Sequence, residues 1–200
     1  MKKKRIHIAT SRDVGERCLA WAYENTPQDY EIIDSMSDCE IFISVLYDTI
    51  VPPDFLNIRD CYNFHPGVLP EYRGAGAFSW CLINKEAKTG ITLHKIAKGI
   101  DDGDIIEIRE FLIAPQDTAS TLFAKGEKLI FKMFKDWYKD LLSKEYIAVP
   151  QNEQNSRIYY RKDLNKAKDL TNIIKAFYFP GKEAAYFINS ENKKEFIVYK

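Results

Sequence analysis

The sequence predicts an α/β protein with a Rossmann-like, mostly parallel sheet and a small C-terminal helix and β-hairpin appended to it. Two observations indicate this fold. Over the first hundred residues, short apolar and β-branched runs alternate with helical patterns, as in right-handed βαβ units. Beyond residue 147 the chain becomes polar and rich in tyrosine. We therefore expect a main domain at residues 1–147 and an appendage at 148–200.

Each element of the main domain follows from a local pattern. Apolar runs predict strands at residues 5–10, 30–34, 39–46, 61–65, 89–97 and 103–114. Helical spacing, or a proline at the start, predicts helices at residues 15–26, 52–59, 75–86 and 117–142. In the last of these, Leu122, Met133 and Leu141 share one apolar face. Asp117 or Thr118 is expected to cap it.

The appendage has its own signals. A short helix is expected within residues 170–181, where a proline and a glycine end the pattern. A hairpin is expected within residues 184–200, with NSENKK as its turn. The free edge of such a hairpin favours pairing with a second copy, so we expect a homodimer.

Composition excludes several classes of protein. The chain is 46% hydrophobic, which suffices for a packed core, and its 29 basic and 29 acidic residues cancel, which argues against nucleic-acid binding. No stretch approaches the roughly 18 apolar residues of a membrane span, and no signal-peptide core follows the basic MKKKR start. The four cysteines occur singly, which favours reduced thiols in the cytoplasm and supports no metal site.

One stretch, NFHPGVLPEYRG at residues 63–74, has neither helix nor strand periodicity. Asn63 and His65 stand at the carboxyl end of a predicted strand, the edge where α/β sheets bind ligands, and Asp101 in GIDDG could return to it. A histidine beside a carboxylate can move protons, and an amide N–H can stabilise an oxyanion. Without a serine or cysteine nucleophile in a strained turn, this combination favours direct transfer to an amine.

The compound pattern NFHPGVLPEYRG…W…GITLHKIAKGIDDGDII resembles the folate-dependent formyltransferase family, strongly over about residues 40–115. The resemblance implies a formyl transfer from N10-formyltetrahydrofolate, the cosubstrate, to an amine. It implies that Asn63 and His65 hold the oxyanion. Asp101, in preference to Asp102, would orient the histidine and help to shuttle protons. His94 in GITLH would be a supporting residue.

The same resemblance implies where folate would lie. SVLYDTIVP, residues 44–52, is similar to the stretch that holds the pterin in family members, largely through backbone. Cofactor-binding residues are then expected at Leu46, Tyr47, Ile50, Val51 and Gly99. Only 62 residues precede Asn63, where family members usually have about a hundred, so the folate wall is expected to be shortened.

Features that the chain lacks argue against some of the acceptor amines used in this family. TSRDVGERC carries a single glycine, unlike the phosphate loop of glycinamide ribonucleotide transformylase. The tRNA enzyme carries a basic C-terminal domain for contact with nucleic acid. Here only about fifty residues follow the core and the net charge is zero, which argues against tRNA as the substrate. The tail is similar instead to sugar N-formyltransferases, which act on nucleotide-linked amino-dideoxy sugars. This implies use of the product in lipopolysaccharide O-antigen or other surface glycans.

A pocket for a nucleotide sugar needs aromatic faces and cations. The substrate-binding candidates are Arg73, Trp80, Tyr159, Tyr178 and Phe179, with Tyr160, Arg157, Arg161 and Lys175 as further candidates. Core or dimer packing is the alternative explanation for the aromatic side chains. Three functions stay open: formylation of a nucleotide amino sugar, formylation of another amine or hydrolysis of the folate, and binding without catalysis. The nucleotide and the position of the amine are not indicated.

Overall fold

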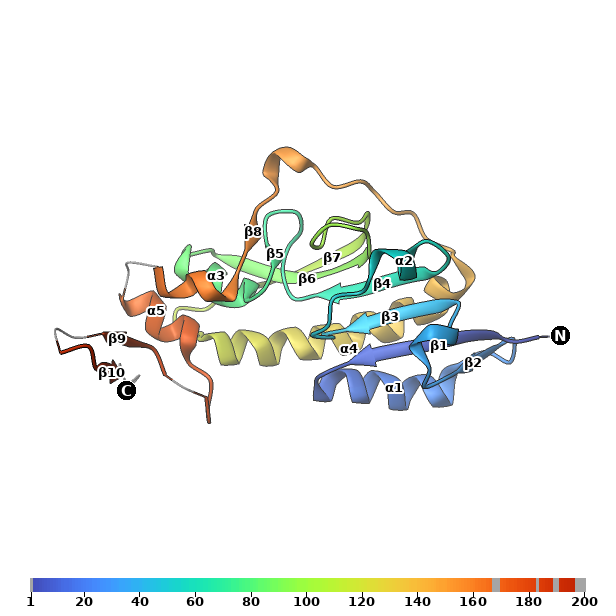
Figure 1. The fold of residues 1–200 in the computed structure, drawn as a ribbon, viewed down its shortest axis with the longest axis horizontal. Helices are drawn as coiled ribbons and strands as arrows, with labels where there is room; N and C mark the ends of the chain where they lie inside the picture. Colours follow the sequence, from blue (N-terminus) through green and yellow to red (C-terminus); the bar gives the residue numbers. More distant parts are fainter. Residues whose placement is uncertain (1, 167–169, 183, 189–190, 197–200) are drawn as a thin grey trace.

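The computed structural model describes residues 2–166, 170–182, 184–188 and 191–196 and confirms the predicted fold class. A six-stranded sheet runs in the order β2-β1-β3-β4-β6-β7 (Figure 1). Its first four strands are parallel and comprise β1 (Lys4–Thr10), β2 (Tyr30–Ile32), β3 (Ile41–Val45) and β4 (Asp60–His65). The last two, β6 (Lys88–Lys95) and β7 (Ile105–Leu112), are antiparallel to their neighbours. The loop 96–104 is too short for a crossover, so it returns the chain as a hairpin.

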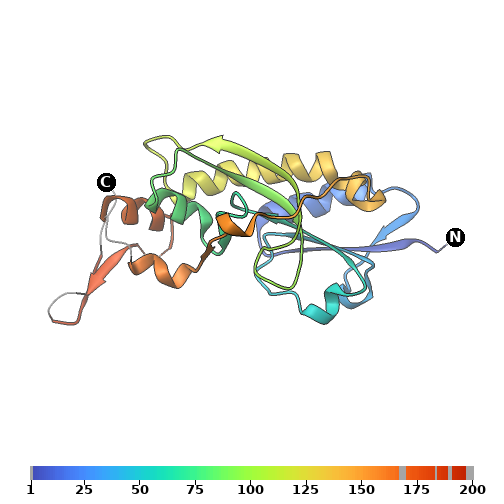
Figure 2. The ribbon, with the colours of Figure 1, turned by 90° about the horizontal axis from the view of Figure 1, so that it is seen from above.

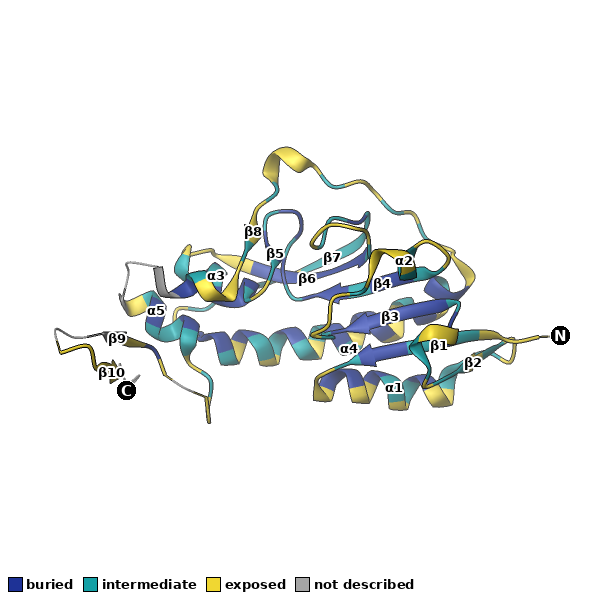
Figure 3. Ribbon diagram, in the orientation of Figure 1, coloured by how far each residue is buried: buried dark blue, intermediate teal, exposed yellow. Residues whose placement is uncertain are grey.

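Helices cover the two faces of the sheet unequally. The long helix α4 (Ala119–Ser143) and α1 (Asp13–Asn25) lie together on one face, and the short α2 (Pro53–Leu56) lies on the other (Figure 2). A 3₁₀ turn, η1 (Met36–Asp38), also packs on the α2 face. The sheet and the inward sides of α1 and α4 form the main core, and the outward side of α1 is exposed (Figure 3).

The sequence allowed either Asp117 or Thr118 as the N-cap of α4, and the structure shows that Thr118 is the cap. Its hydroxyl accepts from the Thr121 amide, and the Thr121 hydroxyl accepts from the Thr118 amide. Asp117 supports the same turn from outside by accepting from the Thr121 hydroxyl and from Lys125. These bonds therefore fix the start of α4, the long helix that covers one face of the sheet.

The period of β4 positions the polar pair. Tyr62 and Phe64 point into the main core, where both are buried. Asn63 and His65 alternate with them and so project from the opposite face of the sheet, the face that carries Cys61 and α2. A strand that is apolar on one side and polar on the other thus presents two functional groups on a rigid support.

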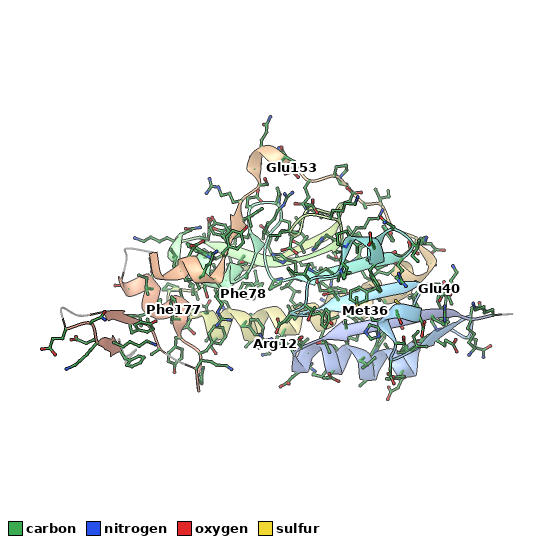
Figure 4. The ribbon with its side chains drawn as sticks, in the orientation of Figure 1. Arg12, Met36, Glu40, Phe78, Glu153 and Phe177 are labelled. Atoms are coloured by element: carbon green, nitrogen blue, oxygen red, sulfur yellow. The ribbon has the colours of Figure 1, made fainter. Side chains whose placement is uncertain are left out.

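After α4 the chain returns over the sheet in an extended segment, residues 148–159, which we call the strap. Val149 bridges to Ile105, then η2 (Glu153–Asn155) forms the crest, where Glu153 stands far from the helical layer (Figure 4). Two short strands, β5 (Arg73–Gly74) and β8 (Ile158–Tyr159), pair in parallel. η3 (Arg161–Lys166) follows. The strap therefore joins the tail to the loop that follows His65.

The expected tail helix and hairpin are both present. Helix α5 (Leu170–Phe177) packs on α3 (Ala77–Ile83), where the buried Ser79 hydroxyl donates to the Ala176 carbonyl. The hairpin pairs β9 (Tyr186–Ile188) with β10 (Lys194–Phe196) at the end of the molecule away from β1 (Figure 1). Residues 189–190 of the predicted turn and 197–200 lie outside the described residues. Because Ala176 belongs to the main core, the tail helix shares that core.

Candidate active site

Three polar side chains form a row across neighbouring strands. Ser44 on β3 lies opposite Asn63 on β4, and Asn63 lies opposite His94 on β6. The Ser44 hydroxyl donates to Asn63 Oδ1 over 2.8 Å, and Asn63 Nδ2 lies 3.2 Å from His94 Nε2. The amide predicted to bind an oxyanion is therefore held from both sides, and the sequence pattern gave no sign of Ser44.

His65 and Asp101 meet beside that row. His65 Nδ1 lies 3.4 Å from Asp101 Oδ2, and His65 Nε2 lies 2.7 Å from the Tyr72 carbonyl oxygen. Both ring nitrogens thus face oxygen acceptors. His65 was expected to help hold the oxyanion, but its Nε2 is already bonded to the Tyr72 carbonyl. In this conformation Asn63 is therefore the better placed donor to an oxyanion.

Asp101 is held ionised by its surroundings. Burial alone would raise the pKa of its carboxyl, but the neighbouring His65 and the Gly74 amide, which donates to Oδ2 over 2.8 Å, bring the pKa below its ordinary value. The backbone at Asp101 is left-handed, with φ of 48°, a conformation more often found in asparagine and aspartate than in other residues with side chains. Left-handed backbone at a residue with a side chain is one of the strained conformations that cluster at functional sites.

His94 is neutral for a geometric and an electrostatic reason. Its Nδ1 lies 2.6 Å from the Lys95 carbonyl and must carry the proton, so Nε2 offers a lone pair to Asn63. Burial lowers the pKa of His94 to about 4, although Asp101 opposes this. The 3.6 Å between His94 Nε2 and Asp101 Oδ1 is therefore not an ion pair near neutral pH.

The neutral His94 predicts a pH dependence of stability. Because the pKa of His94 in the folded chain lies below its ordinary value of 6.5, the unfolded chain binds more protons as the pH falls from about 6.5 to 4. The free energy of unfolding should fall over this window, by up to about 3 kcal/mol from this group. Urea titrations at several pH values measure it. His94→Gln should flatten the slope, and an unchanged slope would contradict the assignment.

The loop between His65 and β5 is pinned from β6. Thr92, fully buried, donates its hydroxyl to the Gly67 carbonyl over 2.7 Å and accepts from the Leu69 amide. A Cβ on Gly67 would come 2.8 Å from His65 Nε2, so only glycine leaves the ring its place. Tertiary contacts therefore hold this loop in one shape.

Arg73 has partners within the protein that the sequence did not suggest. Its side chain is only 5% exposed, and its guanidinium donates to Gln151 Oε1 and to both carboxylate oxygens of Glu153. All of these partners lie on the strap, which the sequence treated as part of an appendage. The contacts favour a structural role, because a cation committed in this way is unavailable to a pyrophosphate.

Gln151 links this ion pair to the catalytic candidates. Its Nε2 donates to the carbonyls of Asp101 and Gly103 while its Oε1 accepts from Arg73. Gln151→Ala should lower the free energy of unfolding by about 1–3 kcal/mol, because buried groups lose partners. The exposed Gln154→Ala on the same strap should stay within about 0.5 kcal/mol of wild type. Equal urea midpoints for the two variants would refute this role.

The expected folate segment leaves the sheet beside His65. Leu46 follows Val45, which pairs with Phe64, and its backbone is left-handed with φ of 53°. Ile50 is 87% exposed and offers an apolar surface. Other expected contacts are already used within the protein. Tyr47 and Val51 pack against the cluster on the α2 face, and the Gly99 amide donates to the Asp102 carboxylate.

The aromatic candidates divide into packed and exposed rings. Tyr159 stacks on Tyr72 with centroids 5.2 Å apart and contacts Trp80 at 4.8 Å. Phe179 packs edge-on against Phe123 and joins the main core. Tyr178 is 40% exposed. The ring contacts found for Tyr159, Trp80 and Phe179 are with other aromatic side chains of the described residues, so packing accounts for most of the candidates.

The remaining cations differ in the same way. Lys175 donates to the Pro115 carbonyl, whereas Arg157, Arg161 and the ring of Tyr160 are exposed. Arg157 lines a cavity of about 570 Å³ with Glu71, Glu86 and Tyr159. Within the described ranges, no three metal-binding side chains come together, and no helix is long and apolar enough to span a membrane. All four cysteines are buried thiols.

Comparison with known proteins now decides the family. The sequence model of the formyl transferase family matches residues 7–135. The chain belongs to the formyl transferase family. A methionyl-tRNA formyltransferase of Malacoplasma penetrans is 31% identical over 166 residues, which cover 78% of this chain and 52% of that protein. This formyl transferase family chain thus spans about half the length of the curated relatives it matches.

Solved structures share the fold over most of the chain. A 4-N formyltransferase from Francisella tularensis superposes with a TM-score of 0.84 at 19% identity, covering 98% of this chain and 97% of that one. The N-formyltransferase of Helicobacter canadensis, in complex with folinic acid and dTDP-3-aminofucose, superposes with a TM-score of 0.77 at 24% identity. It covers 90% of this chain and 81% of that one. At these identities the likeness establishes the fold.

Proposed function

We propose that this protein transfers a formyl group from N10-formyltetrahydrofolate to the amine of a nucleotide-linked amino-dideoxy sugar. The observation that carries the proposal is the contact of His65 with Asp101 beside Asn63, which projects from the same face of β4 as His65. Residues up to 38 positions apart in sequence supply an amide donor, an imidazole and an ionised carboxylate. Membership of the formyl transferase family supports the reaction class.

The three side chains divide the chemistry. The acceptor amine attacks the formyl carbon, a C–N bond forms, and the carbonyl oxygen becomes an oxyanion. Asn63 Nδ2 donates to that oxygen where the charge develops. The Asp101–His65 pair takes the proton that the attacking nitrogen loses and returns one to N10 as the bond from the formyl carbon to N10 breaks. Charge is balanced because one proton leaves the amine and one reaches the folate nitrogen.

The segment 46–52 fits the folate cosubstrate in part. Leu46 leaves β3 next to His65, so a ring lying on this segment would carry its formyl group to Asn63. The exposed Ile50 offers apolar contact, and the strained backbone at Leu46 is typical of a segment shaped for a ligand. Gly99 contributes less than expected, because Asp102 already accepts from its amide. A cytoplasmic location and a homodimer remain part of the proposal.

A nucleotide sugar is the favoured acceptor because the proteins that share this fold over nearly their whole length include sugar N-formyltransferases. Zero net charge also argues against a polyanionic tRNA. Methionyl-tRNA is the second candidate acceptor, since curated relatives at 31% identity are named methionyl-tRNA formyltransferases. Water as the acceptor, which would make the protein a formyltetrahydrofolate hydrolase that releases formate, is the third.

An acceptor panel separates these candidates. The protein is incubated with N10-formyltetrahydrofolate and, in turn, dTDP- and UDP-linked amino-dideoxy sugars, glycinamide ribonucleotide and methionyl-tRNA. Mass spectrometry then shows which amine gains one formyl group. We expect a nucleotide sugar to be formylated. Formylation of methionyl-tRNA alone would replace the proposed acceptor, and folate turnover without any formylated amine would favour hydrolysis.

A further inference from the structure

The orientation of the Asn63 amide is decided by its two neighbours in the sheet. Asn63 Oδ1 receives the hydroxyl hydrogen of Ser44, and Asn63 Nδ2 faces the lone pair of His94 Nε2. The ring of His94 is fixed in turn, because its Nδ1–H donates to the Lys95 carbonyl. One Nδ2 hydrogen is used by His94, which leaves the second for a ligand.

The reversed amide would be poorly accommodated. Turning the Asn63 side chain by half a turn would set Oδ1 against the Nε2 lone pair of His94 and present an acceptor to the developing oxyanion. An acceptor there repels the negative charge that a donor stabilises. The direction of the amide therefore determines whether Asn63 assists or opposes the reaction.

We propose that Ser44 is a positioning residue, whose hydroxyl holds the Asn63 amide with its N–H directed at the reacting carbonyl; this rests on the proposed formyl transfer. Ser44 is 6% exposed and sits directly opposite Asn63 in the parallel pair of β3 and β4. It acts through Asn63 and touches no substrate. His94 holds the other end of the same amide, and we call Ser44 and His94 together the clamp on Asn63.

Ser44→Ala should lower kcat roughly three- to tenfold, the effect of one lost hydrogen bond, and leave KM for folate and amine within about twofold. Ser44→Thr, which keeps the hydroxyl, should restore most of the rate. Ser79→Ala is the matched control, since it also removes a buried serine hydroxyl bonded to another part of the chain. It should reduce stability but leave kcat within about twofold of wild type.

A double-mutant cycle separates positioning from a general structural effect. In the Asn63→Ala background, Ser44→Ala should cause no further loss of kcat, because the group that it positions is gone. A further loss of the same factor would overturn the proposal. So would an unchanged kcat in the single Ser44→Ala variant while the wild type turns over.

A second readout does not depend on turnover. Hydrogen exchange of the Asn63 side-chain amide, followed by ¹⁵N NMR and assigned by its loss in Asn63→Ala, should be faster in Ser44→Ala by roughly three- to tenfold. Exchange equal to wild type would overturn the positioning role. A wild type that formylates no acceptor but shows the accelerated exchange in the variant would instead refute the proposed reaction and leave the clamp supported.

Discussion

Asn63→Ala is expected to lower kcat for formyl transfer by about 100- to 1000-fold, the usual effect of removing one oxyanion donor. The loss should be in kcat more than in KM, because the amide bond to the oxygen strengthens as charge develops in the transition state. Asn63 is the only member of the catalytic candidates with an N–H not committed to a protein acceptor in this conformation, within the described residues. Steady-state kinetics with a formylated acceptor measure the effect.

Asn25→Ala is the matched control for this experiment. Its Nδ2 likewise bonds within the protein, by donating to the Trp21 carbonyl on α1, and it lies on the opposite face of the sheet from Asn63. Its kcat should stay within about twofold of wild type. A loss of less than about tenfold in a folded Asn63→Ala protein would remove Asn63 from the mechanism.

Asp101→Asn is expected to lower kcat by about 100- to 10,000-fold, the range of a lost general acid–base group. Asparagine keeps an oxygen that can accept from the Gly74 amide and tolerates the left-handed backbone at φ of 48°, so the fold should persist. What disappears is the negative charge facing His65. The rate of formyl transfer at saturating substrates, compared with circular dichroism and the urea midpoint, separates the two effects.

Asp102→Asn provides the contrast at the neighbouring position. The Asp102 carboxylate accepts only from the Gly99 amide among the bonds found in the described residues. Its replacement should cost less than about tenfold in kcat, because no proton-transfer partner is lost. Equal losses at Asp101 and Asp102 would show that the charge of the loop, and not the Asp101–His65 pair, governs the rate.

Local pattern was enough to predict most of the elements. The period of two along β4 and the helical face of α4 are properties of short segments, and both are present as expected. The direction of β6 and β7 and the pairing of β5 with β8 could not be derived in the same way. These depend on how the loop 96–104 and the strap return to the sheet, and neither return has a signal within a short window.

The candidate site was predictable where residues were close in sequence or carried by the family pattern. His65 and Asp101 do meet, and Asn63 projects from the same face of β4, although the roles of all three remain proposals. Ser44 and Gln151 were missed because a serine in an apolar strand and a glutamine in a polar strap are common residues. Their importance arises from strand register and from hydrogen bonds between distant segments. The ion pair of Arg73 was missed because its partner Glu153 lies 80 residues away.

The fate of an isotope-labelled formyl carbon tests the account most directly. The protein is given N10-formyltetrahydrofolate labelled at that carbon together with a dTDP-linked amino-dideoxy sugar, and NMR follows the label. The account predicts that the label appears in a formamide on the sugar nitrogen, at a rate that falls by about 100- to 1000-fold in Asn63→Ala. Label recovered only as formate, or formamide produced equally fast by Asn63→Ala, would contradict it.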